Sequence, residues 1–210
     1  MNIIESQLHE FKIALQMHAE EYELTLPDDT VERLAEYFSL LTSWNERLHL
    51  VAFRSPPEFA TRHVLESLML LQYLPTGSRI ADVGSGGGLP AIPCVLARPD
   101  LHAILVEASK RKATFLREVV QQANIKSRVS IVPERFESIA TPDVEVVTSR
   151  ALERFESMLP RLISWSPAKA TLLLFGGTAL GEAIGDIGLS RTRILMPNSE
   201  RRYLFVLKRN

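Results

Sequence analysis

The sequence predicts an α/β fold with a seven-stranded, mostly parallel sheet, a C-terminal antiparallel hairpin and an N-terminal helical cap. Three observations predict it. The first third of the chain carries apolar residues at helical spacing, strand-like and helical runs alternate from Arg79 onward, and a glycine-rich turn follows the first of those runs. With 210 residues and 46% hydrophobic content, the chain is long enough to bury the core of such a fold.

The N-terminal part of the chain has the pattern of packing helices. Apolar residues recur every three or four positions in two stripes, Ile4, Leu8, Phe11 and Leu15, then Val31, Leu34, Phe38 and Leu41. Asp29 precedes the second stripe and Glu32 stands three positions later, so we expect Asp29 to be the N-cap of a capping box. A third helix is expected over 61–74, before Pro75 and Gly77 turn the chain.

The alternation from Arg79 onward requires parallel strands joined by crossover helices. The expected strands are 80–83, 102–107, 129–132, 144–148 and 171–175. Two further runs, 191–196 and 203–208, flank a turn at 197–200 and predict an antiparallel hairpin at the sheet edge. We expect two parts packed as one unit, a helical cap over 1–75 and a cofactor-binding domain over 76–210.

The turn after the first strand is the most informative segment of the chain. Its glycines follow the pattern G-x-G-x-G from Gly84 to Gly88, whereas a dinucleotide fingerprint needs a glycine where Leu89 stands. This spacing disfavours NAD and suits S-adenosyl-L-methionine (SAM), which has no pyrophosphate to seat and whose methionine part lies against a glycine backbone. Glu107 ends the second strand, at the place of an acid that binds ribose hydroxyls.

Together, Asp82, the glycine loop and Glu107 predict the SAM site of a Rossmann-like class I SAM-dependent methyltransferase. The alternative interpretation is a structural glycine-rich turn followed by an ordinary surface acid.

Composition narrows the function classes further. The net charge of -1 gives no overall attraction to nucleic acid or anionic lipid, so RNA binding needs a local basic patch. The single cysteine, Cys94, excludes an internal disulfide, and the five histidines lack metal-ligand spacing, so no metal is expected. The N-terminus has no basic, apolar leader and no run reaches the roughly 20 apolar residues of a membrane helix, so we expect a cytoplasmic protein.

Several motifs resemble the RsmG (GidB) family, whose members methylate N7 of a guanine in bacterial small-subunit (16S) ribosomal RNA. The most specific is the continuation of the glycine loop through Leu89-Pro90-Ala91-Ile92-Pro93, because G-x-G-x-G is common to many methyltransferases and the two prolines are not. Further matches are Arg111-Lys112 with Phe115-Leu116-Arg117, and Thr148-Ser149-Arg150-Ala151, with weaker ones at 44–45 and 62–67. The resemblance spans most of the chain and implies an rRNA (guanine-N7)-methyltransferase that acts on small-subunit ribosomal RNA or the ribosomal particle.

The resemblance also assigns cofactor contacts residue by residue. Gly84 and Leu89 would contact the methyl donor, and Gly86 and Gly88 would shape the same loop. Phe136 and Glu137, after the third strand, match the adenine-binding pair of the family. An aromatic ring at this position can stack on the purine while an acid or backbone group satisfies its amine.

Arg150 is the candidate catalytic residue. It follows the fourth strand and matches the family's arginine near donor and target, where it would hold the donor carboxylate, a phosphate or a guanine edge. The alternative is a surface ion pair with Glu153. No catalytic base is expected, because guanine N7 carries a free lone pair, and alignment of N7 with the donor methyl group supplies roughly 7–11 kcal/mol.

The expected RNA-binding residues form a discontinuous basic set that folding must bring together. Its members are Arg62, His63, Arg111, Lys112, Arg117, Arg201 and Arg202. Phosphate contacts from such a set would make affinity fall with salt. The equally ordinary alternative is a scatter of surface cations, with His63 a polar residue beneath the cap. The sequence carries no heptad pattern, and a monomer is favoured.

The chain departs from the family pattern at positions that concern the substrate more than the cofactor. Phe175 stands where a lysine is expected at the end of the fifth strand, His49-Leu50-Val51 replaces Asn-Leu-Thr, and Ala91 replaces a glycine. Two other functions therefore stay open. One is methylation of another RNA, a small molecule or a protein, and the other is a non-catalytic SAM-binding module that associates with ribosomes.

Overall fold

Seven strands form one sheet in the order β3-β2-β1-β4-β5-β7-β6, which confirms the predicted fold class. The computed structural model describes residues 3–150, 152, 155–185 and 187–209, without the side chains of residues 3 and 4. The strands are β1 Arg79–Val83, β2 His102–Val106, β3 Val129–Val132, β4 Val146–Ser149, β5 Thr171–Gly176, β6 Ser190–Leu195 and β7 Tyr203–Lys208.

The centre of the sheet is parallel, and its strand order reverses at β1. β1 pairs with β2 on one side and with β4 on the other, so that Asp82 lies opposite both Leu105 and Thr148. Ligands of open parallel sheets bind beyond the carboxyl ends of the strands at such a reversal. β7 runs antiparallel to β5 and to β6, which confirms the expected hairpin at the sheet edge.

The fourth strand begins two residues later than the sequence predicted. The Arg79 backbone N–H donates to the Glu145 carboxylate, at 2.7 Å, rather than to a backbone carbonyl. Arg79 also forms ion pairs with Asp143 and Glu145. The Glu145 backbone still bonds to Arg79 and Thr171 on the neighbouring strands, and the regular strand starts one residue later, at Val146.

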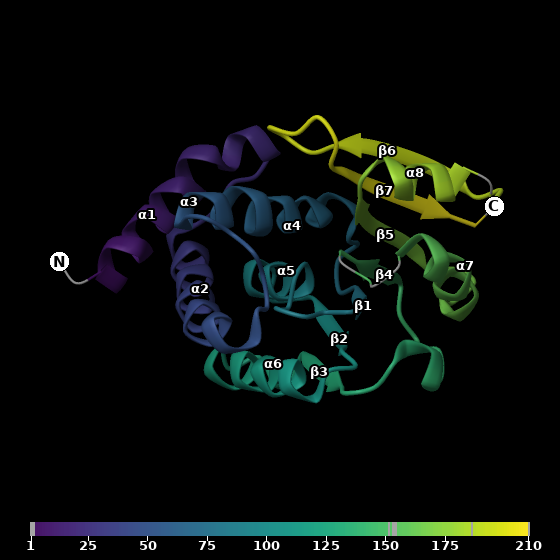
Figure 1. Cartoon of the computed structure of the whole chain (residues 1–210), viewed down its shortest axis with the longest axis horizontal. Helices are drawn as coiled ribbons and strands as arrows, with labels where there is room; N and C mark the ends of the chain where they lie inside the picture. The colour runs from purple at the N-terminus through teal and green to yellow at the C-terminus, as the bar shows by residue number, and fades with distance from the viewer. Residues whose placement is uncertain (1–2, 151, 153–154, 186, 210) are drawn as a thin grey trace.

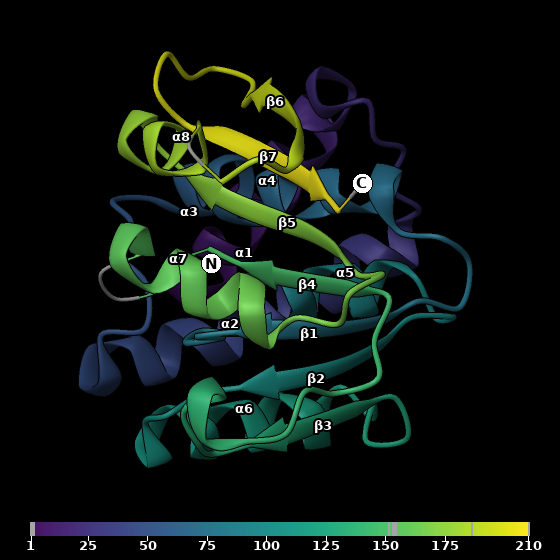
Figure 2. The same cartoon turned by 90° about the vertical axis from the view of Figure 1, so that its right-hand side faces the viewer.

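Helices cover both faces of the sheet (Figures 1 and 2). On one face lie α5 Ala91–Ala97, α6 Lys110–Gln122 and the N-terminal helices, and on the other lie α7 Phe155–Trp165 and α8 Thr178–Gly185. The strands are buried on both sides, as in β5, where Leu173 and Phe175 join the first cluster and Leu172 and Leu174 join the second.

The N-terminal helices pack through aromatic rings. α1 Ile3–His18 and α2 Asp28–Leu48 are joined by a short 3-10 helix, Ala19–Tyr22. The rings of Phe11 and Phe38 stack at 4.5 Å, and Phe59 packs against both. These side chains belong to the same hydrophobic cluster as Ile80 and Leu105 of the sheet.

Two expected helix starts were wrong. α2 begins at Asp28, after Pro27, and Asp29 is not its N-cap. The Asp29 carboxylate instead forms an ion pair with Arg33 at 3.0 Å. The third helical segment begins at Pro56 rather than at 61, because Ser55 accepts a bond from the Glu58 N–H and prolines occupy the first turn. It runs through α3 Pro56–Phe59, η2 Ala60–Leu65, α4 Glu66–Leu68 and η3 Met69–Tyr73.

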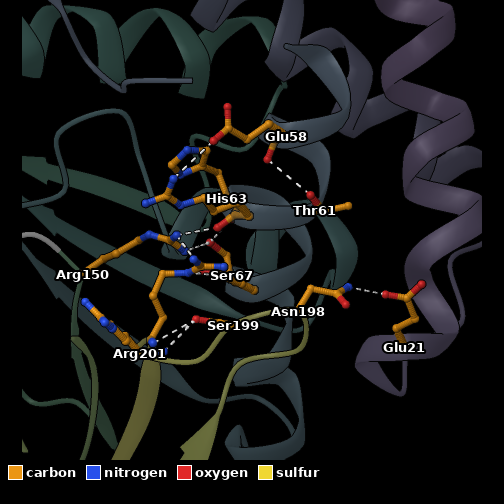
Figure 3. Close-up of polar contacts among 12 residues, drawn as sticks. Glu21, Glu58, Thr61, His63, Ser67, Arg150, Asn198, Ser199 and Arg201 are labelled. Carbon is orange, nitrogen blue, oxygen red and sulfur yellow. Dashed lines mark hydrogen bonds and ion pairs between the residues drawn. The ribbon is translucent and has the colours of Figure 1, made fainter. Parts of the chain in front are cut away.

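The hairpin reaches back to the N-terminal helices. Its turn places Asn198 beside Glu21, with the side-chain amide 2.5 Å from the carboxylate (Figure 3). Cys94, in α5, is buried with a free thiol. Within the described ranges, no helix has the length and apolar character needed to span a membrane.

Candidate functional site

A cavity of about 930 Å³ opens at the carboxyl ends of the central strands. Its walls come from the glycine loop after β1, the end of β2, the segment after β3, the segment after β4, and the N-terminal helices. Ten residues predicted from the sequence line it: Arg62, His63, Gly84, Gly86, Leu89, Glu107, Lys112, Phe136, Glu137 and Arg150. The tertiary structure thus gathers most of the candidate residues around one space.

The glycine loop is shaped by backbone conformations that L side chains rarely adopt. Gly84, Gly86 and Gly88 have φ values of +74°, +53° and +88°. An added Cβ at Gly86 would meet nothing closer than 3.8 Å, because that side of the loop faces the cavity. Gly88 instead faces the protein, where an added Cβ would stand 2.6 Å from Cγ1 of Ile92.

Gly88→Ala is therefore expected to destabilise the fold. The new methyl group overlaps Ile92, and the residue is held at a φ that costs about 1–2 kcal/mol for an L side chain, so we expect a loss of about 2–4 kcal/mol. Chemical denaturation measures this, with Gly77→Ala as control, since Gly77 has a φ of +72° and no atom within 4 Å of an added Cβ. Equal losses in the two variants would contradict the packing role of Gly88.

Glu107 ties the loop to the next helix. Glu107 is 8% exposed. Its carboxylate accepts a bond from the Gly86 N–H at Oε2 and one from the Ser109 N–H at Oε1, both at 2.8 Å. Ser109 is in turn the N-cap of α6 and accepts the Lys112 N–H. The carboxylate is thus held at the cavity wall with lone pairs left for hydroxyl donors.

Asp82 does not line the cavity, in contrast to the expected cofactor contact. It is fully buried in β1, burial raises the pKa of its carboxyl group well above the usual value, and neither carboxylate oxygen has a hydrogen-bond partner among the described residues. Its backbone carbonyl accepts the Ser85 hydroxyl at 2.9 Å. The Asp82 side chain, like the side of the loop at Gly88, therefore faces the protein interior and not the cavity.

Phe136 lines the cavity from the segment after β3. The residue is buried, and its ring packs edge-to-face on the ring of Trp165, with centroids 5.6 Å apart. Glu137, beside it, is exposed at the cavity wall. An aromatic edge next to an acid suits a purine, as the resemblance implies.

Arg150 is mostly buried, with its side chain 14% exposed, which disfavours the alternative of a surface ion pair, and Glu153 lies outside the described residues. The guanidinium pairs instead with Glu66 of α4 at 2.9 Å and donates to the Arg62 carbonyl at 2.5 Å. Burial lowers the pKa of Arg150, and the Glu66 charge opposes that shift. The cation lies 5.2 Å from the ring centroid of Phe175, the residue that stands in place of the expected lysine.

His63 is a neutral hydrogen-bonding group at the cavity wall. Its Nε2 donates to the Ala52 carbonyl at 3.2 Å, since a carbonyl can only accept, and its Nδ1 has no bond to any described residue. Desolvation, followed by the charge of Arg150, lowers the pKa of His63 to about 3. The ring packs on Phe59, with centroids 5.4 Å apart.

The depressed pKa of His63 predicts a pH effect on stability. Between about pH 6.5, the ordinary pKa, and pH 3, the unfolded state binds a proton that the folded state refuses. Folding stability therefore falls as pH drops through this window, by at most about 1.4 kcal/mol per pH unit. Chemical denaturation of wild type and of His63→Gln at pH 4.5 and pH 7 measures this loss of stability. Glu58, which contributes to the electrostatic environment of His63, is present in both proteins, so its own titration cancels in the comparison.

We expect a smaller loss on acidification in His63→Gln than in wild type. The same pH dependence in both proteins would contradict this assignment.

The basic residues are only partly gathered. Arg62 pairs with Glu58 at 3.2 Å and lines the cavity with Lys112, whereas Arg111 and Arg117 lie on α6 away from it. Arg201 is exposed and Arg202 reaches Glu66 from the hairpin. In the part of the chain that the structure describes, no three His, Cys, Asp or Glu side chains are grouped as for a metal ion.

Two cations at the cavity were missed from the sequence. Arg135 precedes the Phe136–Glu137 pair and Arg161 lies on α7, and both are exposed. The position of Arg135 next to a predicted contact was an available signal. No spacing in the sequence marks Arg161, because its helix meets the cavity only through the fold.

Comparison with known proteins decides the family. A family model described as GidB, rRNA small subunit methyltransferase G, matches residues 30–183. The chain belongs to the GidB family. The resemblance inferred from the glycine loop and its prolines is thereby confirmed.

Curated relatives of this GidB-family protein are named ribosomal RNA small subunit methyltransferase G. The one from Nitrosomonas eutropha is 41% identical over 157 residues, which cover 72% of this chain and 70% of the relative. The one from Sorangium cellulosum is 35% identical over 170 residues, covering 78% and 71%. The one from Halorhodospira halophila is 31% identical and covers 82% of both chains.

Solved structures show the same fold at low sequence identity. Magnesium protoporphyrin IX methyltransferase from Synechocystis PCC 6803, with bound SAM, matches at a TM-score of 0.63 and 15% identity, covering 89% of this chain and 99% of that one. Ribosomal protein L11 methylase from Lactobacillus delbrueckii subsp. bulgaricus matches at 0.59 and 14% identity, covering 76% and 82%. The GidB-family chain thus has the fold of SAM-dependent methyltransferases.

Proposed function

We propose that this protein transfers a methyl group from SAM to N7 of a guanine in small-subunit (16S) ribosomal RNA. The observation that carries the proposal is the cavity itself, in a chain of the GidB family. A glycine loop and a held carboxylate line the cavity together with Arg62, His63 and Arg150. Its volume of about 930 Å³ lies at the upper end for small-molecule sites, which leaves room for a base beside a cofactor.

The residues present fit SAM. The open side of Gly86 leaves room for a ligand against the backbone, and the Glu107 carboxylate, which lines the cavity, would accept bonds from the ribose hydroxyls. Phe136 and Glu137 would hold the adenine, with Gly84 and Leu89 against the methionine part. When bound, SAM supplies an electrophilic methyl group on a sulfonium.

The chain's own contribution is alignment. Guanine N7 carries an in-plane lone pair and loses no proton, so the site needs neither a catalytic base nor a metal. Holding the base in line with the methyl group is worth roughly 7–11 kcal/mol. We assign this task to Arg150 and to the wall formed by the N-terminal helices, residues 1–75, acting as a cap on the 76–210 domain.

The cations around the cavity mouth would hold the RNA backbone. Arg62, Lys112, Arg135 and Arg161 line the cavity, and Arg201 is exposed on the β6–β7 hairpin. Each phosphate contact adds to the salt dependence of binding. We also propose that the protein acts as a monomer, and that it works in the cytoplasm, because a ribosomal RNA substrate would be met there.

Transfer of a labelled methyl group from SAM tests this function. The acceptors are unmodified small ribosomal subunits and the same RNA stripped of protein, and nuclease digestion locates the label. We expect label at N7 of a guanine, lost with Gly86→Val. SAM binding without label in either acceptor would contradict the proposal and favour another acceptor or a binding role.

A further inference from the structure

Glu66 is a buried carboxylate at the junction of three segments. It lies on α4, within the N-terminal helices, and is 1% exposed. A carboxylate removed from water keeps its charge only where cations and hydrogen-bond donors surround it. The groups that surround Glu66 therefore indicate its role.

Two arginines from segments distant in sequence share the Glu66 carboxylate. Arg150, from the carboxyl end of β4, binds Oε2 at 2.9 Å, and Arg202, from the β6–β7 hairpin, binds Oε1 through Nη2 at 2.8 Å and Nε at 2.9 Å. Arg150 has a side-chain exposure of 14%, against 36% for Arg202. One carboxylate thus links the cap, the hairpin and the cavity.

The remaining contacts of Arg150 complete its orientation. Nη2 also donates to the Arg62 carbonyl, and Nη1 lies 3.5 Å from the Ser67 hydroxyl (Figure 3). The ring of Phe175 lies 5.2 Å from the guanidinium carbon and is itself buried in β5. A long, flexible side chain is in this way held in one place, with its other N–H groups left for a ligand in the cavity.

We propose that Glu66 is a positioning residue for methyl transfer, acting through Arg150 and docking the β6–β7 hairpin through Arg202. The inference rests on the proposed function and adds to it the residue that aims Arg150. Removal of the Glu66 charge frees the guanidinium from its main partner and leaves two buried or half-buried arginines facing each other. Arg150 then loses its alignment, and Arg202 loses the carboxylate that holds the hairpin to α4.

A double-mutant cycle tests the inference. The variants are Glu66→Gln, Arg150→Met and the two combined, with Glu66→Asp as the conservative variant. Glu145→Gln is the matched control, because Glu145 also holds an arginine, Arg79, but at the opposite end of the sheet. Two readouts are measured on each protein: kcat/KM for methyl transfer to small ribosomal subunits, and Kd for SAM by calorimetry.

We expect Glu66→Gln to lower kcat/KM about 10-fold to 100-fold, as for a misplaced aligning group. Because Glu66 acts through Arg150, Glu66→Gln and Arg150→Met affect the same one of the two measured quantities. When Arg150 is already Met, adding Glu66→Gln changes that quantity by less than about twofold. Glu66→Asp recovers part of the loss, and Glu145→Gln leaves both readouts near wild type.

Multiplicative losses in the double variant, or full activity in Glu66→Gln, would overturn the inference while the proposed function stands. A wild type that labels no RNA overturns the proposed function and this inference with it. If Glu66→Gln fails to fold, the same cycle is run with Glu66→Asp, which keeps the charge on a side chain one carbon shorter and is expected to lower kcat/KM only where Arg150 is present.

Discussion

Gly86→Val abolishes SAM binding in a protein that stays folded. The φ of +53° costs an L side chain about 1–2 kcal/mol, which a folded domain of this size tolerates. No protein atom lies within 3.8 Å of an added Cβ, so the valine side chain projects into the space that we assign to the methionine part of SAM. Calorimetry with SAM and thermal denaturation measure the two effects separately, and we expect no measurable affinity.

The control for backbone strain is Gly77→Val. Gly77 has a φ of +72° and no atom within 4 Å of an added Cβ, and it lies before β1, away from the cavity. We expect Gly77→Val to lose similar stability and to bind SAM as wild type does. A folded Gly86→Val protein with wild-type SAM affinity would show that the loop does not hold the cofactor.

Glu107→Gln is expected to weaken SAM binding about 10-fold to 100-fold, which corresponds to roughly 1.4–2.8 kcal/mol. The carboxylate accepts the Gly86 and Ser109 N–H groups with separate oxygens, and a glutamine amide accepts only at one of them. One backbone N–H then faces an amide NH₂, the loop shifts, and an acceptor for a ribose hydroxyl is lost. Calorimetric Kd values for SAM measure the loss.

The matched control is Glu118→Gln, on α6, where the carboxylate accepts a bond from Gln122 away from the cavity. We expect its Kd for SAM to equal that of wild type. If Glu107→Gln binds SAM equally well, the carboxylate serves the loop alone, and the ribose must be held elsewhere.

Local signals in the sequence were sufficient for the sheet and for the cofactor side of the cavity. The strands could be predicted because buried parallel strands are short apolar runs, and the loop because Gly84, Gly86 and Gly88 each need a positive φ. Glu107 followed from its place after the second strand. These features depend on residues close together in the chain, where spacing and residue type carry the information.

Contacts between distant segments were not predictable in this way. Nothing near Glu66 in the sequence indicates that it pairs with Arg150 and Arg202, which lie 84 and 136 positions further along. The start of the third helical segment was missed because Ser55 and two prolines outweighed the apolar periodicity. Arg161 reaches the cavity only because α7 packs across the sheet from the cap.

The sequence by itself determined the fold, the family and the glycine loop, since backbone conformation and strand burial are local properties of the chain. Only the tertiary structure decided that Arg150 is mostly removed from water and held by Glu66, that the pKa of His63 is lowered, and that Asp82 is buried. The physical reason is that charge state and orientation depend on desolvation and on partners, and both are set by which distant segments pack together.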